Sequence, residues 1–420
     1  MNLKSKRIGI WGLGVGGKAI VEFLVNHDGC ELFVFDKKAL SAQEYIFLKK
    51  NKACQINDLQ YFLDHCDFVF PSAGIDLRLY QSYKPKFLAE LDLFQKYFKK
   101  PVIAITGTLG KTTVTIILAQ ILESAGKKVV VGGNIGVGLC SLLSHDDEID
   151  YAVIEVSSFQ LELCKRFAPR FSVWTNFSPN HLDRHSSLKE YFLAKCNIVR
   201  YQQERDTACV PEAMLDAIRN ESLYLHRWRA IPEEVPADLA LHIPSFGLAE
   251  NWNILAVILN ELKLPFELLK KVGDVSLEHR VEFVILVNGR SFYNDSKSTV
   301  PGATLSAIQR FTQPVILLLG GLSKGISRKH MIEQLKGRVK RVVIFGKERE
   351  QLARWCRQYD ILVDEMPSMN EAVEKAYNES DEGDVVLLSP AGSSFDLFKN
   401  YQERGTVFKE LIFTLKDRYE

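Results

Sequence analysis

Apolar positions in the first hundred residues alternate between short runs and helical spacing. Runs of β-branched and aromatic residues predict strands at 7–11, 31–35 and 67–70. Apolar residues at helical spacing predict a helix at 17–25, between the first two of these strands. Such an alternation is typical of a parallel sheet covered by helices.

The middle of the chain opens with a short, fully apolar run. Residues 102–105 predict a buried strand, and a helical pattern follows at 114–125. Further strands are expected at 128–131 and 151–156. We therefore place a second α/β unit here and end it near residue 276.

The last third of the chain begins with a hairpin signal. Asn288-Gly289 separates two apolar stretches, at 281–287 and 291–293, and this dipeptide suits the tightest hairpin turn. Further strands, separated by helical patterns, are expected at 315–319, 339–345 and 385–388. The pattern again predicts a largely parallel sheet.

Length and composition agree with a globular chain of several domains. The 420 residues suggest about three domains, which we place at 1–99, 100–276 and 277–420. Lys plus Arg (53) nearly equals Asp plus Glu (52), so no basic field is available to attract nucleic acid or an anionic membrane. The eight cysteines are scattered and form no Cys-x-x-Cys pair, and no apolar run could span a bilayer. We expect a cytoplasmic protein, and a monomer.

Residues 106–113, Thr-Gly-Thr-Leu-Gly-Lys-Thr-Thr, lie between the strand at 102–105 and the helix that follows. A glycine-rich turn at a helix start directs backbone N–H groups toward a phosphate. Lys111 would reach the β- and γ-phosphates, and Thr112 or Thr113 would place a hydroxyl on Mg²⁺. The general pattern has glycine where this chain has Ile105, so this is a variant loop. It predicts the use of ATP or GTP.

A second glycine-rich turn follows the first strand. Residues 12–17 read Gly-Leu-Gly-Val-Gly-Gly, and Asp36 follows at the end of the second strand, as in the Rossmann dinucleotide fingerprint. An NAD-dependent oxidoreductase would explain this motif. A nucleotide-sugar diphosphate fits equally well, because a glycine turn at a helix start binds any diphosphate. The glycines would also suit simple packing of helix on strand.

Other motifs are difficult to explain as packing. Glu155 is a lone carboxylate inside an apolar strand, which is costly unless it is paired or binds a metal. Polar motifs follow most of the predicted strands: GGNIG at 132–136, SSFQL at 157–161, NFSPNHLDRH at 176–185, EHRVE at 278–282, NDSKST at 294–299, GGLSKG at 320–325 and SPAGSSFD at 389–396.

Together with the loop at 106–113, these motifs resemble those of the Mur ligase family of ATP-dependent amide-forming enzymes. The resemblance implies an α/β protein with a Rossmann-like first domain, a P-loop-type central ATPase domain and a Rossmann-like third domain. The run LSPAGSSFDLF with Arg404-Gly405, and NDSKST, favour the members that join D-glutamate to UDP-N-acetylmuramoyl-L-alanine through an acyl phosphate.

The resemblance also implies site residues. Catalysis would rest on Lys111, Glu155, His181 and Lys195. ATP would contact Gly107, Thr108, Gly110, Lys111, Thr112, Thr113, Asn253, Arg280 and Asp295. The UDP substrate would contact Gly14, Val15, Asp36, Ser72, Asn134 and His181, and D-glutamate would contact Lys297, Thr299, Lys324, Ser394 and Tyr401.

Two magnesium ions are implied as cofactors. Their ligands would be Thr112, Glu155, His181 and Lys195, the last as a carbamate. An ammonium at Lys195 would repel a metal, whereas a carbamate offers oxygen ligands, so the modification would invert the electrostatic role of this side chain.

Plain structural alternatives exist for several of these residues. Lys195 could be an ordinary surface lysine, His279 and Arg280 a structural pair, and His185 a surface or core histidine. The chain also departs from the family pattern at Leu109, Asn180, Ala249 and Glu250, which would alter contacts with the nucleotide and the metals. Besides the oxidoreductase, a sister or folate-type ligase and a nucleotide-binding regulator descended from a ligase stay open.

Overall fold

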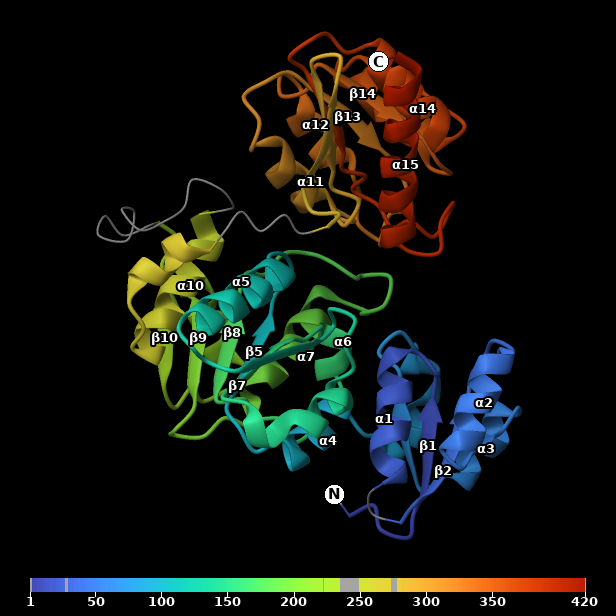
Figure 1. The fold of residues 1–420 in the computed structure, drawn as a ribbon, viewed down its shortest axis with the longest axis vertical. Helices are drawn as coiled ribbons and strands as arrows, with labels where there is room; N and C mark the ends of the chain where they lie inside the picture. Colours follow the sequence, from blue (N-terminus) through green and yellow to red (C-terminus); the bar gives the residue numbers. More distant parts are fainter. Residues whose placement is uncertain (1, 27–28, 222, 235–248, 273–277, 420) are drawn as a thin grey trace. The chain divides into compact units, whose positions relative to one another are not determined.

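The computed structural model describes residues 2–26, 29–221, 223–234, 249–272 and 278–419. Its strands form three separate sheets, and the helices cover them (Figure 1). By its internal contacts the chain divides into two compact units. The first unit comprises Met1–Ser178 and Lys189–Gly273 and contains two sheets, and the second comprises Pro179–Leu188 and Asp274–Glu420 and contains the third.

The first sheet is fully parallel, with the strand order β3-β2-β1-β4. Its strands are β1 (Arg7–Trp11), β2 (Glu31–Phe35), β3 (Ala53–Gln55) and β4 (Phe68–Pro71). Helices α1 (Val15–Val25), α2 (Ala42–Lys50) and α3 (Leu59–His65) connect them. Ile8 and Ile10 of β1 are completely buried, as the apolar run at 7–11 predicts. This order is that of half a Rossmann fold.

The second sheet has six parallel strands in the order β10-β9-β8-β5-β7-β6. They are β5 (Val102–Thr106), β6 (Val129–Gly133), β7 (Tyr151–Glu155), β8 (Phe171–Trp174), β9 (Thr207–Pro211) and β10 (Trp228–Ile231). The helices of this part are α4 (Glu90–Tyr97), α5 (Lys111–Ser124), α6 (Ser158–Leu161), α7 (Leu188–Arg200), α8 (Leu215–Asn220) and α10 (Ala249–Leu262). Strand β5 is buried along its whole length, because strands flank it and helices cover it.

The third sheet has the order β11-β12-β16-β13-β14-β15 and one antiparallel edge strand, β11. Its strands are β11 (Glu282–Val287), β12 (Arg290–Asn294), β13 (Val315–Leu319), β14 (Arg341–Ile344), β15 (Val363–Glu365) and β16 (Val385–Leu388). Its helices are α11 (Pro301–Ile308), α12 (Lys329–Leu335), α13 (Arg349–Gln358), α14 (Met369–Asn378) and α15 (Tyr401–Tyr419). Short 3-10 helices complete the chain: η1 (Leu77–Lys86), η2 (Leu139–Glu148), η3 (Glu212–Met214) and η4 (Phe266–Lys271).

The predicted hairpin is present between β11 and β12. Asn288 and Gly289 have φ angles of 45° and 72°, the left-handed conformations that a two-residue hairpin turn requires. The α/β class with parallel sheets is confirmed, and each sheet takes all its strands from one of the three predicted ranges. Among the described residues no helix is both long and apolar enough to cross a bilayer.

Candidate active site

The phosphate loop joins β5 to α5 through two glycines with positive φ. Gly107 has φ 145° and Gly110 has φ 79°, and a Cβ atom on Gly107 would lie 1.9 Å from Thr175 Oγ1. A side chain at either position would therefore distort the loop. Helix α5 begins at Lys111 without a side-chain cap, so its N-terminus suits an anion. Lys111 Nζ donates to the carbonyls of Gly107 and Thr108, both at 2.9 Å.

Residues after β8 brace this loop at Leu109, where the family pattern has a side-chain hydrogen bond that leucine cannot make. The backbone N–H of Leu109 donates to Asn176 Oδ1 at 2.9 Å, and its carbonyl accepts from Thr175 Oγ1 at 2.5 Å. We predicted no role for Asn176. The strand before it, β8, was not predicted either, and its place beside β5 appears only in the folded sheet, so the sequence offered no signal for this contact.

Glu155 ends β7 and is only 1% exposed. Thr112 Oγ1 donates to its Oε2, and Asn134 Nδ2 donates to its Oε1 at 2.7 Å. A buried carboxylate beside a hydroxyl at a phosphate loop fits Mg²⁺, which takes few protein ligands together with phosphate oxygens. Among the described residues no group of three or more His, Cys, Asp or Glu side chains is placed to hold a metal ion.

Lys195 is a core residue of α7 and not a surface lysine, since it is 1% exposed. Its Nζ donates to the Gly107 carbonyl at 2.7 Å and to Thr106 Oγ1 at 3.3 Å, and it lies 4.8 Å from the centre of the Tyr191 ring. Burial, and then the positive charge of Lys111, lower the pKa of Lys195 well below its usual value, although Glu155 opposes this shift. Lys195 therefore lies beside the phosphate loop in surroundings that disfavour its charged form.

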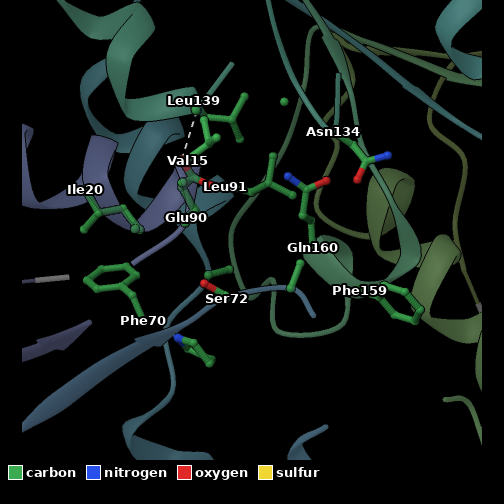
Figure 2. A pocket seen from close by; sticks show the side chains of 18 of the residues that line it. Val15, Ile20, Phe70, Ser72, Glu90, Leu91, Asn134, Leu139, Phe159 and Gln160 are labelled. Carbon is green, nitrogen blue, oxygen red and sulfur yellow. Dashed lines mark hydrogen bonds between the residues drawn. The ribbon is translucent and has the colours of Figure 1, made fainter. Parts of the chain in front are cut away.

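The first unit also contains a pocket of about 320 Å³ (Figure 2). Four residues that we predicted for the UDP substrate line it: Gly14, Val15, Ser72 and Asn134. Phe159 and Gln160 line it too, and neither was among the predicted contacts. Asp36 does not line it, and its carboxylate instead accepts from the N–H groups of Leu13 at 2.8 Å and Lys38 at 2.9 Å. The acidic residue of the fingerprint thus fixes the turn that follows β1.

Glu90, at the start of α4, is a pocket residue that sequence analysis missed. Its Oε1 accepts from the N–H of Leu139 at 2.9 Å (Figure 2) and from the N–H of Cys140 at 3.4 Å. A Cβ atom on Gly16 would lie 3.2 Å from its Oε2. Burial raises the pKa of this carboxyl group. Glu90 therefore joins the start of η2 to the glycine turn at α1.

In the second unit, the predicted D-glutamate residues follow three adjacent parallel strands, β12, β16 and β13. Lys324 Nζ donates to Thr299 Oγ1 at 2.9 Å. Lys297 Nζ lies 5.1 Å from the centre of the Tyr401 ring. Ser394 is buried in the loop after β16. The carboxyl ends of such strands are where ligands bind in open α/β sheets.

Two residues that we predicted for the nucleotide, Asp295 and Asn253, make mainly structural contacts. Asp295 is 4% exposed, and it accepts from Ser389 Oγ at 2.7 Å and from the N–H of Val281 at 3.3 Å. Burial raises the pKa of Asp295 to about 6. Asn253 Nδ2 donates to the Pro232 carbonyl at 3.0 Å.

The predicted metal ligands are divided between the two units. Thr112, Glu155 and Lys195 lie together in the first unit, whereas His181 belongs to the second and has a φ of 56°. His185 is completely buried, so it is a core histidine. His279 pairs with Asn294 at 2.9 Å. Ala249 and Glu250, two of the departures from the family pattern, begin α10.

Known proteins resemble the whole chain. Residues 7–78 match the MurD N-terminal domain, residues 105–223 the Mur ligase middle domain, and residues 279–392 the Mur ligase glutamate ligase domain. The UDP-N-acetylmuramoylalanine--D-glutamate ligase of Thermoanaerobacter sp. (strain X514) is 32% identical over 464 residues, 99% of this chain and 100% of that protein. The enzyme of the same name from Desulfotalea psychrophila is 35% identical, over 97% of this chain and 96% of that protein.

Solved structures of low sequence identity share the fold. MurF ligase from Thermotoga maritima, in complex with ADP, has a TM-score of 0.62 at 15% identity, and covers 100% of this chain and 96% of its own. MurF from Acinetobacter baumannii has a TM-score of 0.61 at 15% identity, over 97% of this chain and 94% of its own. With relatives above 30% identity along its whole length, the chain belongs to the Mur ligase family.

Proposed function

We propose that this protein is an ATP-dependent ligase that joins D-glutamate to UDP-N-acetylmuramoyl-L-alanine in peptidoglycan precursor synthesis. The observation that carries the proposal is the position of Asn134, which lines the substrate pocket and also holds Glu155 at the phosphate loop. A carboxylate brought by the substrate would thereby meet the γ-phosphate of ATP. The relatives that carry the name of this activity cover the chain from end to end, which supports the same acceptor.

In the first half of the reaction, the substrate carboxylate attacks the γ-phosphorus of ATP, the bond to the bridging oxygen breaks, and ADP leaves. Lys111 would exchange its bonds to the loop carbonyls for phosphate oxygens and neutralise the charge that spreads over them. Thr112 and Glu155 would hold Mg²⁺, which supplies charge neutralisation at the β- and γ-phosphates. Gly107, Thr108, Gly110 and Thr113 would position the nucleotide through the loop and the start of α5.

In the second half, the amine of D-glutamate attacks the carbonyl carbon of the acyl phosphate. The tetrahedral intermediate collapses, inorganic phosphate leaves with the bonding electron pair, and the nitrogen loses a proton. Lys324, Thr299 and Ser394 would bind the two carboxylates of the acceptor, with Lys297 and Tyr401 beside them. These donors suit an acidic amino acid, because each carboxylate needs a cation or several N–H or O–H groups.

We further propose that Lys195 carries a carbamate. A neutral amine can attack carbon dioxide, and loss of one proton from nitrogen leaves an anionic carbamate. Burial lowers the pKa of Lys195 and so favours the neutral form that this step needs. The carbamate would reverse the charge of the side chain beside Gly107 and supply oxygen atoms to the metal site.

The test is the release of phosphate from ATP with UDP-N-acetylmuramoyl-L-alanine and a panel of L- and D-amino acids. Turnover with D-glutamate alone supports the proposal. Turnover with another amino acid would instead indicate a sister ligase, and no turnover would favour a nucleotide-binding regulator. Binding of UDP-sugars without any change in NADH fluorescence would dispose of the oxidoreductase alternative. We place the enzyme in the cytoplasm, where ATP and these precursors meet, and expect a monomer.

A further inference from the structure

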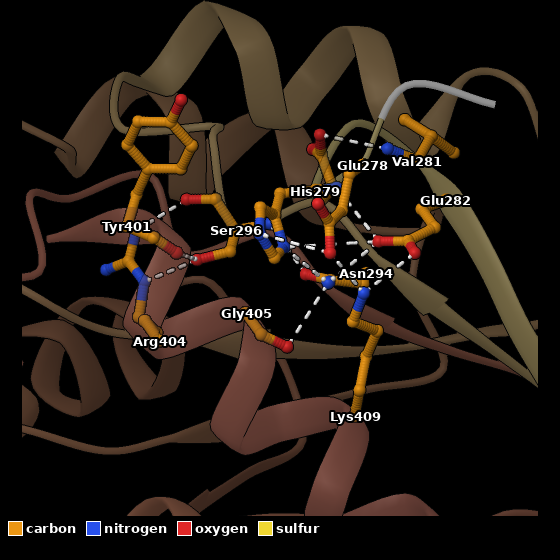
Figure 3. A network of polar contacts seen from close by, with 11 residues as sticks. Glu278, His279, Val281, Glu282, Asn294, Ser296, Tyr401, Arg404, Gly405 and Lys409 are labelled. Carbon is orange, nitrogen blue, oxygen red and sulfur yellow. Dashed lines mark hydrogen bonds and ion pairs between the residues drawn. The ribbon is translucent and has the colours of Figure 1, made fainter. Parts of the chain in front are cut away.

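Arg404, near the start of α15, is completely buried in the second unit. Its Nε donates to Ser296 Oγ at 3.0 Å and its Nη2 to the Ser296 carbonyl at 2.7 Å (Figure 3). Its Nη1 donates to the Gly392 carbonyl at 3.0 Å. No carboxylate of the described residues forms an ion pair with it. The guanidinium thus donates its hydrogen bonds to backbone and hydroxyl oxygens of two loops.

These two loops carry acceptor-site residues. Ser296 lies in the loop after β12, which continues to Lys297 and Thr299, and Gly392 lies in the loop after β16, which continues to Ser394. Two backbone hydrogen bonds connect the loop after β16 to the loop after β13, which carries Lys324. Ser393 N donates to the Leu322 carbonyl at 2.7 Å, and Leu322 N donates to the Ser393 carbonyl at 2.9 Å. Arg404 therefore ties together the segments from which the predicted D-glutamate contacts project.

Burying the charged side chain of Arg404 to connect two loops costs free energy. Burial lowers the pKa of Arg404 to about 10, which reflects the cost of holding a charge away from water. Only a rigid, planar group with several N–H directions can bond a hydroxyl and two carbonyls on separate segments at once, and lysine has no such fork. The start of α15 is also fixed in place, because a Cβ atom on Gly405 would lie 2.2 Å from His279 Nδ1 (Figure 3).

We infer that Arg404 is a positioning residue that sets the spacing between the Thr299 and Ser394 loops and thereby the selectivity for the acceptor amino acid. This inference rests on the proposed function. Arg404 does not touch the acceptor, since it is fully buried. A small change in the spacing of the donors would disturb D-glutamate, whose two carboxylates must both be met, more than it disturbs ATP.

The test compares Arg404→Lys with Arg290→Lys. Arg290 begins β12 at the opposite end of the strand and likewise braces backbone, through bonds of 3.0 and 2.9 Å to the Ser380 carbonyl. We expect Arg404→Lys to raise the KM for D-glutamate about tenfold, as loss of a charged hydrogen bond does. Its preference for D-glutamate over D-aspartate, as a ratio of kcat/KM values, should fall several-fold. The KM for ATP should stay within about twofold, and Arg290→Lys should change none of these quantities by more than that.

Equal changes in the KM values for ATP and D-glutamate, or an unchanged acceptor preference in Arg404→Lys, would overturn the inference. If Arg404→Lys does not fold, Ser296→Ala takes its place, because it removes one acceptor of Arg404 and leaves the arginine. Ser296→Ala should raise the KM for D-glutamate and lower the preference for D-glutamate over D-aspartate, each by about threefold. If neither quantity changes in Ser296→Ala, the inference is likewise overturned. A wild-type protein without D-glutamate-dependent phosphate release would instead refute the proposed function.

Discussion

Asn134 Nδ2 donates to Glu155 Oε1 at 2.7 Å, and the two residues are also joined through the backbone, from Asn134 N to the Glu155 carbonyl at 2.9 Å. Asn134 follows β6 and Glu155 ends β7, and these strands are neighbours in the sheet. Asn134 at the same time lines the pocket that we assign to the UDP substrate. One amide therefore couples the substrate pocket to the carboxylate that faces the phosphate loop.

Asn134→Ala should remove this coupling. We expect kcat/KM for the UDP substrate to fall at least about tenfold, since a buried carboxylate loses a hydrogen-bond donor. The Mg²⁺ concentration for half-maximal activity should rise, because the orientation of Glu155 would be less restricted. Phosphate-release assays across a magnesium series measure both quantities. A normal magnesium curve in this variant would show that Asn134 serves the substrate alone.

Lys195→Ala should abolish most of the activity, and millimolar acetate or formate should restore part of it by supplying the missing carboxylate. Lys195→Arg should be inactive and not be rescued, because a guanidinium stays charged and forms no carbamate. Wild-type activity should also fall in buffers depleted of carbon dioxide. Full activity of Lys195→Ala without any added carboxylate would show that no carbamate is needed.

Two substitutions of Glu90 separate the effect of its charge from the effect of its hydrogen bond. Glu90→Gln keeps an oxygen that can accept from Leu139 and removes a negative charge from the pocket, so the KM for the anionic UDP substrate should fall about twofold to fivefold. Glu90→Ala removes the acceptor too, which releases the start of η2, and the KM should rise. Steady-state kinetics at low ionic strength tests this. Identical effects of the two substitutions would mean that the charge has no influence.

Asp295 predicts a pH dependence of stability. Its folded-state pKa of about 6 lies above its unfolded value, so between pH 4 and 6 the folded state binds more protons than the unfolded state. Its contribution to stability is therefore complete below pH 4 and is lost as the pH rises to 6, at a cost of about 3 kcal/mol. Asp295→Asn should be more stable than the wild type at pH 7.5, and this advantage should vanish at pH 4.

Denaturant unfolding of both proteins at the two pH values gives the comparison. Asp295→Asn leaves the Ser389 hydroxyl with an acceptor. Ser389 Oγ also lies 3.0 Å from Thr304 Oγ1, and the hydroxyl can turn to donate there. A difference in unfolding free energy that is the same at both pH values would indicate a packing effect and not titration.

Local patterns predicted the phosphate loop and eleven of the sixteen strands in the described residues, but missed β3, β8, β9, β10 and β15. β3 and β15 have only three residues each, too few to show a periodic pattern. The strands at 7–11, 31–35, 315–319 and 385–388 have the predicted bounds, because short apolar runs become buried strands in any parallel sheet. The loop at 106–113 lies between β5 and α5 as expected. The dinucleotide fingerprint was ambiguous, because its glycines indicate a tight turn at a helix start and do not distinguish NAD from a nucleotide-sugar diphosphate.

The sequence by itself determined the α/β class, eleven of the sixteen strands in the described residues, the polar motifs that accompany them and, through these motifs, the family. Only the tertiary structure decided what those residues do. Asn134 reaches Glu155 across 21 positions, and Arg404 reaches Ser296 across 108. The lowered pKa of Lys195 likewise depends on burial by segments remote in sequence. Burial and long-range hydrogen bonds arise when the strands assemble side by side, and no local pattern encodes them.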